Sequence, residues 1–182
     1  MHGRRSAKRT RWCSWSRRSS RRSARPAEVG WRGYLLPRLT ERTGLVWACL
    51  IVGAIWAAWH LPLFFMPGAD TYHQSFSLYA LQVIAYSIAL AWLYWRTGGS
   101  VLLTMFMHAA LNNTKDIVPS AGAPGTSVFS LDGTLVFRLT VLLLWVVGAV
   151  LLVRMRGVTR VGNEPGWQAL DNSTVTPRVV SG

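Results

Sequence analysis

Hydrophobic positions in this chain gather into long uninterrupted runs that are separated by short polar segments. Residues 45–65 contain no Asp, Glu, Lys or Arg. A helix of that length, rising about 1.5 Å per residue, crosses a hydrocarbon core of roughly 30 Å. Similar runs at 75–95 and 134–153 predict two more spans, and 100–113 predicts a helix of about half the usual spanning length.

The polar segments predict where the helices begin and end. Pro26 fits the first turn of a helix at 27–39, because its missing N–H is not needed there. Pro37 and the polar residues that follow it to Gly44 predict a break before the first full span. The expected fold class is all-α: a polytopic membrane helix bundle with about four spans plus the half-span helix at 27–39.

Composition supports a membrane protein. Hydrophobic residues make up 51% of the chain and charged residues 15%, below the roughly 25% of soluble domains. The net charge of +13 is concentrated in residues 1–25, which hold ten of the twenty Lys and Arg and no acid. The rest of the chain has ten basic and seven acidic residues, a net of +3, so no nucleic-acid partner is expected.

Three segments follow from this distribution. Residues 1–25 are interpreted as a basic disordered arm that lies on anionic lipid or in solvent. A second interpretation is a wrong start or a frame change upstream of Ala27, which would make the arm an artefact. Residues 26–157 are expected to form the membrane domain, and 158–182 a disordered tail.

Basic residues also predict the orientation of the spans, because Lys and Arg are enriched in cytoplasmic loops. Here they occur at alternate turns, at Arg38, Arg42, Arg96, Arg154, Arg156 and Arg160. These turns and the C-terminus are therefore placed in the cytoplasm. We expect a multi-pass protein of the cell membrane of a bacterium.

Polar side chains inside the spans are the candidate functional residues, since a titratable group at membrane depth is costly without partners. Counting along the helices from the turn at Arg42, Glu28 and His60 each lie roughly 22–25 Å above it. His108 and Asn112, four residues apart on one helix face, lie roughly 14–20 Å above the same side. These four side chains are expected to meet in one zone of the membrane.

Each candidate also has a simpler interpretation. His60 alone could satisfy a neighbouring carbonyl group, and His108 with Asn112 could make an interhelical hydrogen bond. Glu28 and Arg32, spaced i, i+4, could form only a helix ion pair. The common depth of these residues in the membrane favours a shared functional site over the simpler interpretations. A carboxylate with an imidazole can activate water or hold a divalent metal, and a second imidazole with a carboxamide can stabilise an oxyanion. This combination indicates acyl hydrolysis, with a peptide bond as the expected target.

The same residues fall into three ordered motifs: Ala27-Glu28-Val-Gly-Trp-Arg32, Trp56-Ala-Ala-Trp-His60 and His108-Ala-Ala-Leu-Asn112. They resemble the motifs Glu-Glu-x-x-x-Arg, aromatic-x-x-x-His and His-x-x-x-Asn of the CAAX prenyl protease and bacteriocin-immunity family of intramembrane metallo-endopeptidases. The resemblance covers about residues 26–153. It departs at Ala27, where the family has the glutamate to which water activation is assigned, and at the basic arm, where the family has further spans.

The resemblance implies roles for the candidate residues. Glu28, His60, His108 and Asn112 correspond to the catalytic positions; His60 would position or activate water, and His108 and Asn112 would hold the oxyanion. Structural support would come from Arg32 and Trp56. A divalent metal such as zinc is the implied cofactor, with His60 and His108 as its candidate ligands.

The implied function is that of an intramembrane endopeptidase. It would hydrolyse peptide bonds of prenylated, CAAX-type, or other membrane-associated proteins with activated water. The alternative is a catalytically impaired membrane binding or bacteriocin-immunity protein that uses the same pocket. Membrane lipids and a membrane-associated peptide or prenylated protein are the expected partners.

Overall fold

The computed structural model describes residues 28–72, 74–114, 127–131 and 133–160. The regular elements of these residues are helices, which confirms the all-α prediction. In chain order they are the π-helix η1 (Trp31–Leu35), α2 (Leu36–His60), the 3-10 helix η2 (Leu61–Phe65), α3 (Phe76–Arg96), α4 (Val101–Thr114) and α5 (Leu135–Arg154). Residues 28–30 are helical as well and lead into η1.

Three helical segments of the described residues are long and apolar enough to cross a membrane: Glu28–Phe65, Phe76–Arg96 and Leu135–Arg154. α4 has 14 residues and a length of about 21 Å, which is less than the thickness of the hydrocarbon core. The described part of the chain is therefore a membrane helix bundle with three spanning segments and the short α4, where about four spans were expected.

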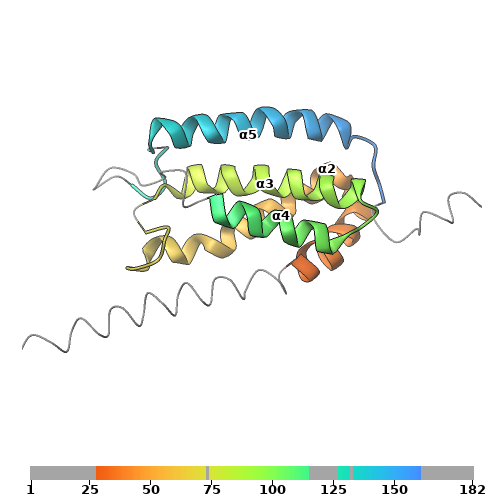
Figure 1. The fold of residues 1–182 in the computed structure, drawn as a ribbon, viewed down its shortest axis with the longest axis horizontal. Coiled ribbons are helices and arrows are strands. Elements are labelled where there is room, and N and C mark those ends of the chain that lie inside the picture. Colours follow the sequence, from red (N-terminus) through yellow and green to blue (C-terminus); the bar gives the residue numbers. More distant parts are fainter. Residues whose placement is uncertain (1–27, 73, 115–126, 132, 161–182) are drawn as a thin grey trace, which may run out of the picture.

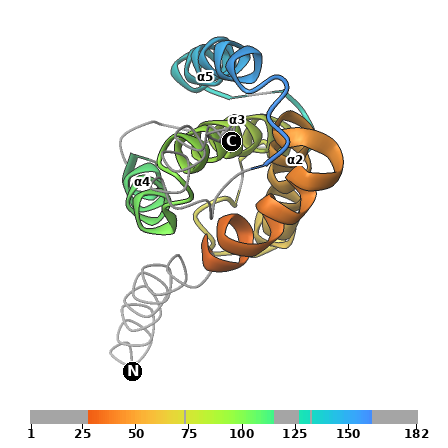
Figure 2. The same cartoon turned by 90° about the vertical axis from the view of Figure 1, so that its right-hand side faces the viewer.

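α3 is the central helix of the bundle. It contacts α2, α4 and α5, and Figure 2 shows α2 and α4 on either side of it, with α5 lying over it. η1 contacts both α2 and α4. The first helical segment therefore closes the side of the bundle that faces away from α5.

The break predicted between Pro37 and Gly44 lies at the end of that segment, and the helix continues through Pro37. The N–H of Leu36 donates to the carbonyl oxygen of Trp31, five residues earlier, in the π-type bond of η1. A wider turn at this point lets the helix continue past the proline, whose missing N–H interrupts the regular ladder. The helix breaks instead at Gly44, where φ is 79° and ψ is 159°, a conformation that glycine adopts at low cost.

Small residues bring α2 and α3 close together. A Cβ added at Gly53 would lie 3.0 Å from the Cα of Ile84 and from the Cβ of Ser87. The hydroxyl of Ser87 donates to the carbonyl oxygen of Cys49 at 2.9 Å. Such close approach and interhelical bonding are typical of helices that associate in lipid. This contact fixes the position of the second half of α2, which carries Trp56 and His60.

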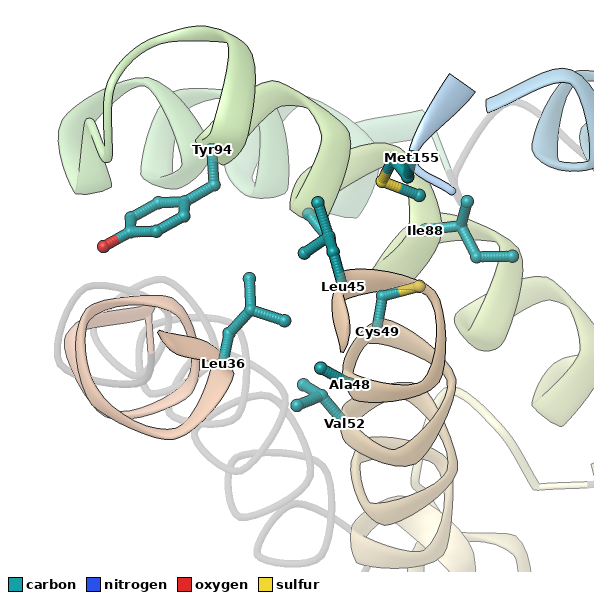
Figure 3. Packing of buried hydrophobic residues seen from close by; sticks show 9 residues of the cluster. Leu36, Leu45, Ala48, Cys49, Val52, Ile88, Tyr94 and Met155 are labelled. Carbon is teal, nitrogen blue, oxygen red and sulfur yellow. The ribbon is translucent and has the colours of Figure 1, made fainter. Parts of the chain in front are cut away.

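The chain after α5 returns to the kink in α2. Figure 3 shows Met155 beside Leu45 and Ile88 in the main apolar core, where it is fully buried. The N–H of Leu45 donates to the carbonyl oxygen of Val158 at 2.8 Å, which satisfies an amide left without a helical partner by the break at Gly44. The predicted tail boundary after 157 falls inside this segment. The predicted arm at 1–25 and residues 161–182 lie outside the described residues.

Candidate active site

Glu28 is the centre of the polar contacts within the bundle. Its Oε1 accepts a hydrogen bond from Nη1 of Arg32 at 2.8 Å and lies 2.6 Å from Nδ1 of His108. Glu28 and Arg32 are fully buried, and His108 is 6% exposed. The helix ion pair and the interhelical contact, which the sequence offered as separate interpretations, thus occur together on one carboxylate oxygen.

The partner of His108 determines which of its ring nitrogens is available. An ionised carboxylate only accepts hydrogen bonds, so Nδ1 carries the hydrogen in the contact with Glu28. Nε2 is then an acceptor when the ring is neutral and a donor when the ring is protonated. His108 is therefore held in one orientation with its second nitrogen left for chemistry.

Two buried atoms of the same ion pair have no hydrogen-bond partner among the described residues: Oε2 of Glu28 and Nη2 of Arg32. One is an acceptor and the other a donor, and buried polar atoms are normally satisfied by protein or by ordered water. The ion pair can thus take one further hydrogen bond on each side. A water molecule or a polar group of a ligand would satisfy them.

Trp56 connects the two histidines of the site. Its ring lies 4.9 Å from the ring of His108 and 6.3 Å from that of His60, between centroids. The guanidinium carbon of Arg32 lies 4.9 Å from the Trp56 ring centroid, in a cation–π contact. We call Glu28, Arg32, Trp56, His60 and His108 the polar centre.

His60 occupies the end of α2, where the helix tightens into η2. Its Nδ1 lies 2.9 Å from the carbonyl oxygen of Trp56, so the contact with a nearby carbonyl that the simpler interpretation expected is present. A carbonyl oxygen only accepts, and Nδ1 therefore carries the hydrogen. Nε2 of the neutral ring keeps its lone pair. The bond that orients His60 thus also leaves it with the nitrogen that a general base requires.

Tyr79 is a neighbour of the site that the sequence reasoning missed. Its ring centroid lies 5.6 Å from that of His60 and 5.1 Å from that of Phe64. The one available signal was a phenol inside an apolar run, because a buried tyrosine normally serves a polar contact as well as packing. α3 thereby places an aromatic ring beside His60, and the same ring packs against the apolar cluster that contains Trp56.

The polar residues of α4 lie in different environments. Thr104, one turn before His108, is buried, and its hydroxyl donates to the carbonyl oxygen of Val101 at 2.7 Å. Asn112, one turn after His108, is exposed. The predicted convergence therefore holds directly for Glu28 and His108. His60 is connected to them by the ring of Trp56. Asn112 lies at the outer edge of the group.

The described residues do not form a metal centre by themselves. They contain no group of three or more His, Cys, Asp or Glu side chains that could hold a metal ion. Nδ1 of each histidine is engaged, which leaves two ring nitrogens, and catalytic zinc sites use about three protein ligands. A metal bound by His60 and His108 would need ligands beyond these.

A protein-family model described as Type II CAAX prenyl endopeptidase Rce1-like matches residues 26–114. That range contains the three motifs and all five residues of the polar centre. The chain belongs to the CAAX prenyl protease and bacteriocin-immunity family. The family prediction made from the motifs is therefore confirmed.

The family member is also similar to the CAAX prenyl protease 2 of Methanococcus maripaludis. The two are 28% identical over 97 residues, which cover 50% of this chain and 36% of that protein. The chain thus spans about a third of the length of this curated relative. No solved structure matches the chain.

Proposed function

We propose that this protein is an intramembrane endopeptidase that uses activated water to hydrolyse peptide bonds of prenylated, CAAX-type, or other membrane-associated proteins. The observation that carries the proposal is the contact of Glu28 with His108 inside a membrane bundle, beside Trp56 and His60. The family match and the name of the methanococcal relative support the reaction and the substrate class.

His60 is assigned to the attacking water. The bond from Nδ1 to the carbonyl oxygen of Trp56 fixes the ring and leaves the lone pair of Nε2 to accept a proton. Contact with Trp56 and Tyr79 limits the directions from which water can approach. The proton taken from water would then be passed to the amine that leaves when the peptide bond breaks.

His108 and Asn112 are assigned to the oxyanion that forms on the peptide carbonyl. The carboxamide of Asn112 is a donor at an exposed position, where a substrate can reach it. Nε2 of His108 donates only when the ring is protonated, and its Nδ1–H then makes a charged pair with Glu28. The family resemblance supplies these roles, and the contacts of His108 are compatible with them.

Glu28 is assigned a positioning role, although its motif position counts it among the catalytic residues. Its Oε1 is shared by Arg32 and His108, so this oxygen holds His108 in place, and only Oε2 is left to accept a further hydrogen bond. Arg32 in turn compensates the buried carboxylate and contacts Trp56. The water-activating carboxylate of the family has no equivalent in this pair.

Ala27 favours a second function for the chain. A protein without the motif's first glutamate could bind a membrane peptide with the polar centre and not cleave it, as an immunity or interaction protein would. Ala27 lies outside the described residues and is identified by its position in the first motif. The two functions predict different results in one assay.

The proposed setting is the cell membrane of a bacterium, with the arginine-rich turns and the C-terminus in the cytoplasm. Support comes from the position of the charges: the ends of α3 and α5 that carry Arg96 and Arg154 lie at the same end of the bundle as the kink of α2 (Figure 1). Basic residues favour the cytoplasmic side of membranes.

Cleavage of a fluorogenic farnesylated CAAX peptide by the purified protein in lipid nanodiscs tests the proposal. We expect His60→Ala to abolish cleavage while peptide binding persists. His73→Ala is the matched control, because it removes a histidine outside the three motifs, and it should leave cleavage unchanged. Peptide binding without cleavage by the wild-type chain would favour the second function, and neither binding nor cleavage would refute both.

Ala27→Glu restores the family's carboxylate and separates the two functions further. A positioned general base contributes roughly 10²–10⁴-fold to the rate, so a gain of that order is expected if the missing glutamate limits the chain. Zinc dependence stays a prediction. Removal of metal with a chelator and readdition of zinc, with cleavage and zinc content both measured, would test it.

A further inference from the structure

Six exposed arginines gather at one end of the bundle. They come from three separate segments: the kinked part of α2, the end of α3, and the end of α5 with the chain that follows it. The six are Arg38, Arg42, Arg96, Arg154, Arg156 and Arg160. Figure 1 shows these segments at the same end of the molecule. We call these six residues the basic end.

The fold holds this arrangement in place. The N–H of Leu45 donates to the carbonyl oxygen of Val158, and Met155 is buried in the core beside Leu45. The segment that carries Arg156 and Arg160 is therefore held against the kink that carries Arg42. A basic tail without such contacts would not keep a fixed spacing between its charges.

The arginines of the basic end make no ion pair with another described residue. The ion pairs among the described residues are those of Glu28 with Arg32 and with His108, and both belong to the polar centre. The one described acid at the basic end, Glu41, is exposed and makes no such pair. Concentrated positive charge without internal compensation attracts anions from the surroundings.

Aromatic rings lie among these arginines. The guanidinium carbon of Arg38 is 5.2 Å from the ring centroid of Tyr34, and that of Arg96 is 5.8 Å from the ring centroid of Trp95. Trp47, one turn beyond the kink, is 63% exposed. Tyr and Trp prefer the headgroup level of a bilayer, so these rings place the basic end at the depth of lipid phosphates.

We infer that the basic end is a binding surface for anionic phospholipid headgroups. Guanidinium groups pair with phosphate oxygens in a planar, two-bond geometry. Clusters of about four to eight basic residues beside a membrane span are typical of anionic-lipid recognition. A lipid phosphate would supply negative charge that, among the described residues at this end, only Glu41 carries, and the acyl chains of the lipid would lie along the apolar helices.

Lipid retention by the full-length protein tests this inference. The protein is reconstituted in nanodiscs that contain equal amounts of phosphatidylglycerol and phosphatidylcholine, and the lipids that stay bound after gentle detergent extraction are counted by native mass spectrometry. The wild-type protein should retain phosphatidylglycerol preferentially. In the triple variant Arg38→Gln, Arg96→Gln, Arg156→Gln this preference should fall by roughly fivefold or more.

The basic arm provides a matched control, because it could attract the same lipids. Arg17→Gln, Arg18→Gln, Arg21→Gln removes the same number of charges from residues 1–25 and should keep the preference. A second triple variant, Arg38→Lys, Arg96→Lys, Arg156→Lys, keeps the charge and should retain an intermediate preference. The inference fails if the glutamine triple variant at the basic end binds lipid as the wild type does, or if the arm variant alone removes the preference.

Discussion

The polar centre and the basic end differ in how their charged side chains are compensated. In the polar centre, one buried carboxylate oxygen of Glu28 serves both a guanidinium and an imidazole. At the basic end, six exposed arginines have no ion pair with a described residue. The environment accounts for the contrast, because a buried ion without a partner costs roughly several kcal/mol, whereas water and headgroups accommodate an exposed one. Internal pairing is needed only where the surroundings supply no counter-charge.

The strongest test of this comparison removes one buried charge. Glu28→Gln leaves Arg32 without its counter-ion, and we expect the free energy of unfolding to fall by about 3–5 kcal/mol. Denaturant unfolding in detergent, followed by tryptophan fluorescence, measures it. Glu41→Gln is the matched control at the basic end and should change stability by less than about 0.5 kcal/mol. Equal stability of the two variants would contradict the buried pair.

A double variant separates the missing contact from the unpaired charge. If Arg32 is costly because it is left charged and buried, Glu28→Gln with Arg32→Gln should recover part of the stability that Glu28→Gln loses. A double-mutant cycle gives the coupling energy between the two residues. Simple additivity of the two losses would show that the charges do not interact.

The next largest effect is expected at Trp56, whose ring contacts Arg32 and both histidines. Trp56→Phe keeps an aromatic ring but weakens a cation–π contact that is worth about 2 kcal/mol when it is shielded from water. Trp59→Phe is the control, because Trp59 is 74% exposed. Unfolding midpoints of the two variants should differ clearly, and equal midpoints would argue against a structural role for Trp56.

A smaller effect is expected from the kink that forms the basic end. Gly44→Ala places a Cβ at a φ of 79° and a ψ of 159°, a backbone region that is essentially restricted to glycine, at a cost of about 1–2 kcal/mol. Gly30→Ala tests a glycine with helical φ and no atom within 4 Å of an added Cβ, and it should be neutral or slightly stabilising. The unfolding assay used for Glu28 measures both, and a neutral Gly44→Ala would mean that the backbone at the kink can relax.

The sequence predicted the membrane bundle because uncharged apolar runs of about twenty residues are typical of membrane-spanning helices. It also predicted that Glu28 and His108 would meet, since helix rise converts residue counts into depth. The simpler interpretations of Glu28 and His60 were correct in part, because the ion pair with Arg32 and the carbonyl contact of His60 are both present. Spacing along a chain does not show that one oxygen serves two partners.

Other features depended on contacts that no local pattern encodes. The passage of the helix through Pro37 requires the π-type bond between Leu36 and Trp31, which sequence periodicity does not indicate. Val158 is the first residue of the predicted tail, and its carbonyl group accepts the hydrogen bond from the N–H of Leu45, a contact that the local sequence does not indicate. Tyr79 reaches His60 only because α3 is the central helix.

The smallest effect should come from a single arginine at the basic end. In detergent without anionic lipid, Arg96→Gln loses only an exposed charge over Trp95, so its cost in unfolding free energy should stay below about 1 kcal/mol. Added salt should reduce that cost further, because screening acts on exposed charges. The cost of Glu28→Gln should hardly change with salt, since its partners are shielded from solvent. If Arg96→Gln and Glu28→Gln lost the same stability and responded alike to salt, the basic end and the polar centre would share one electrostatic environment. The distinction between internal pairing of buried charges and external compensation of exposed charges would then be wrong.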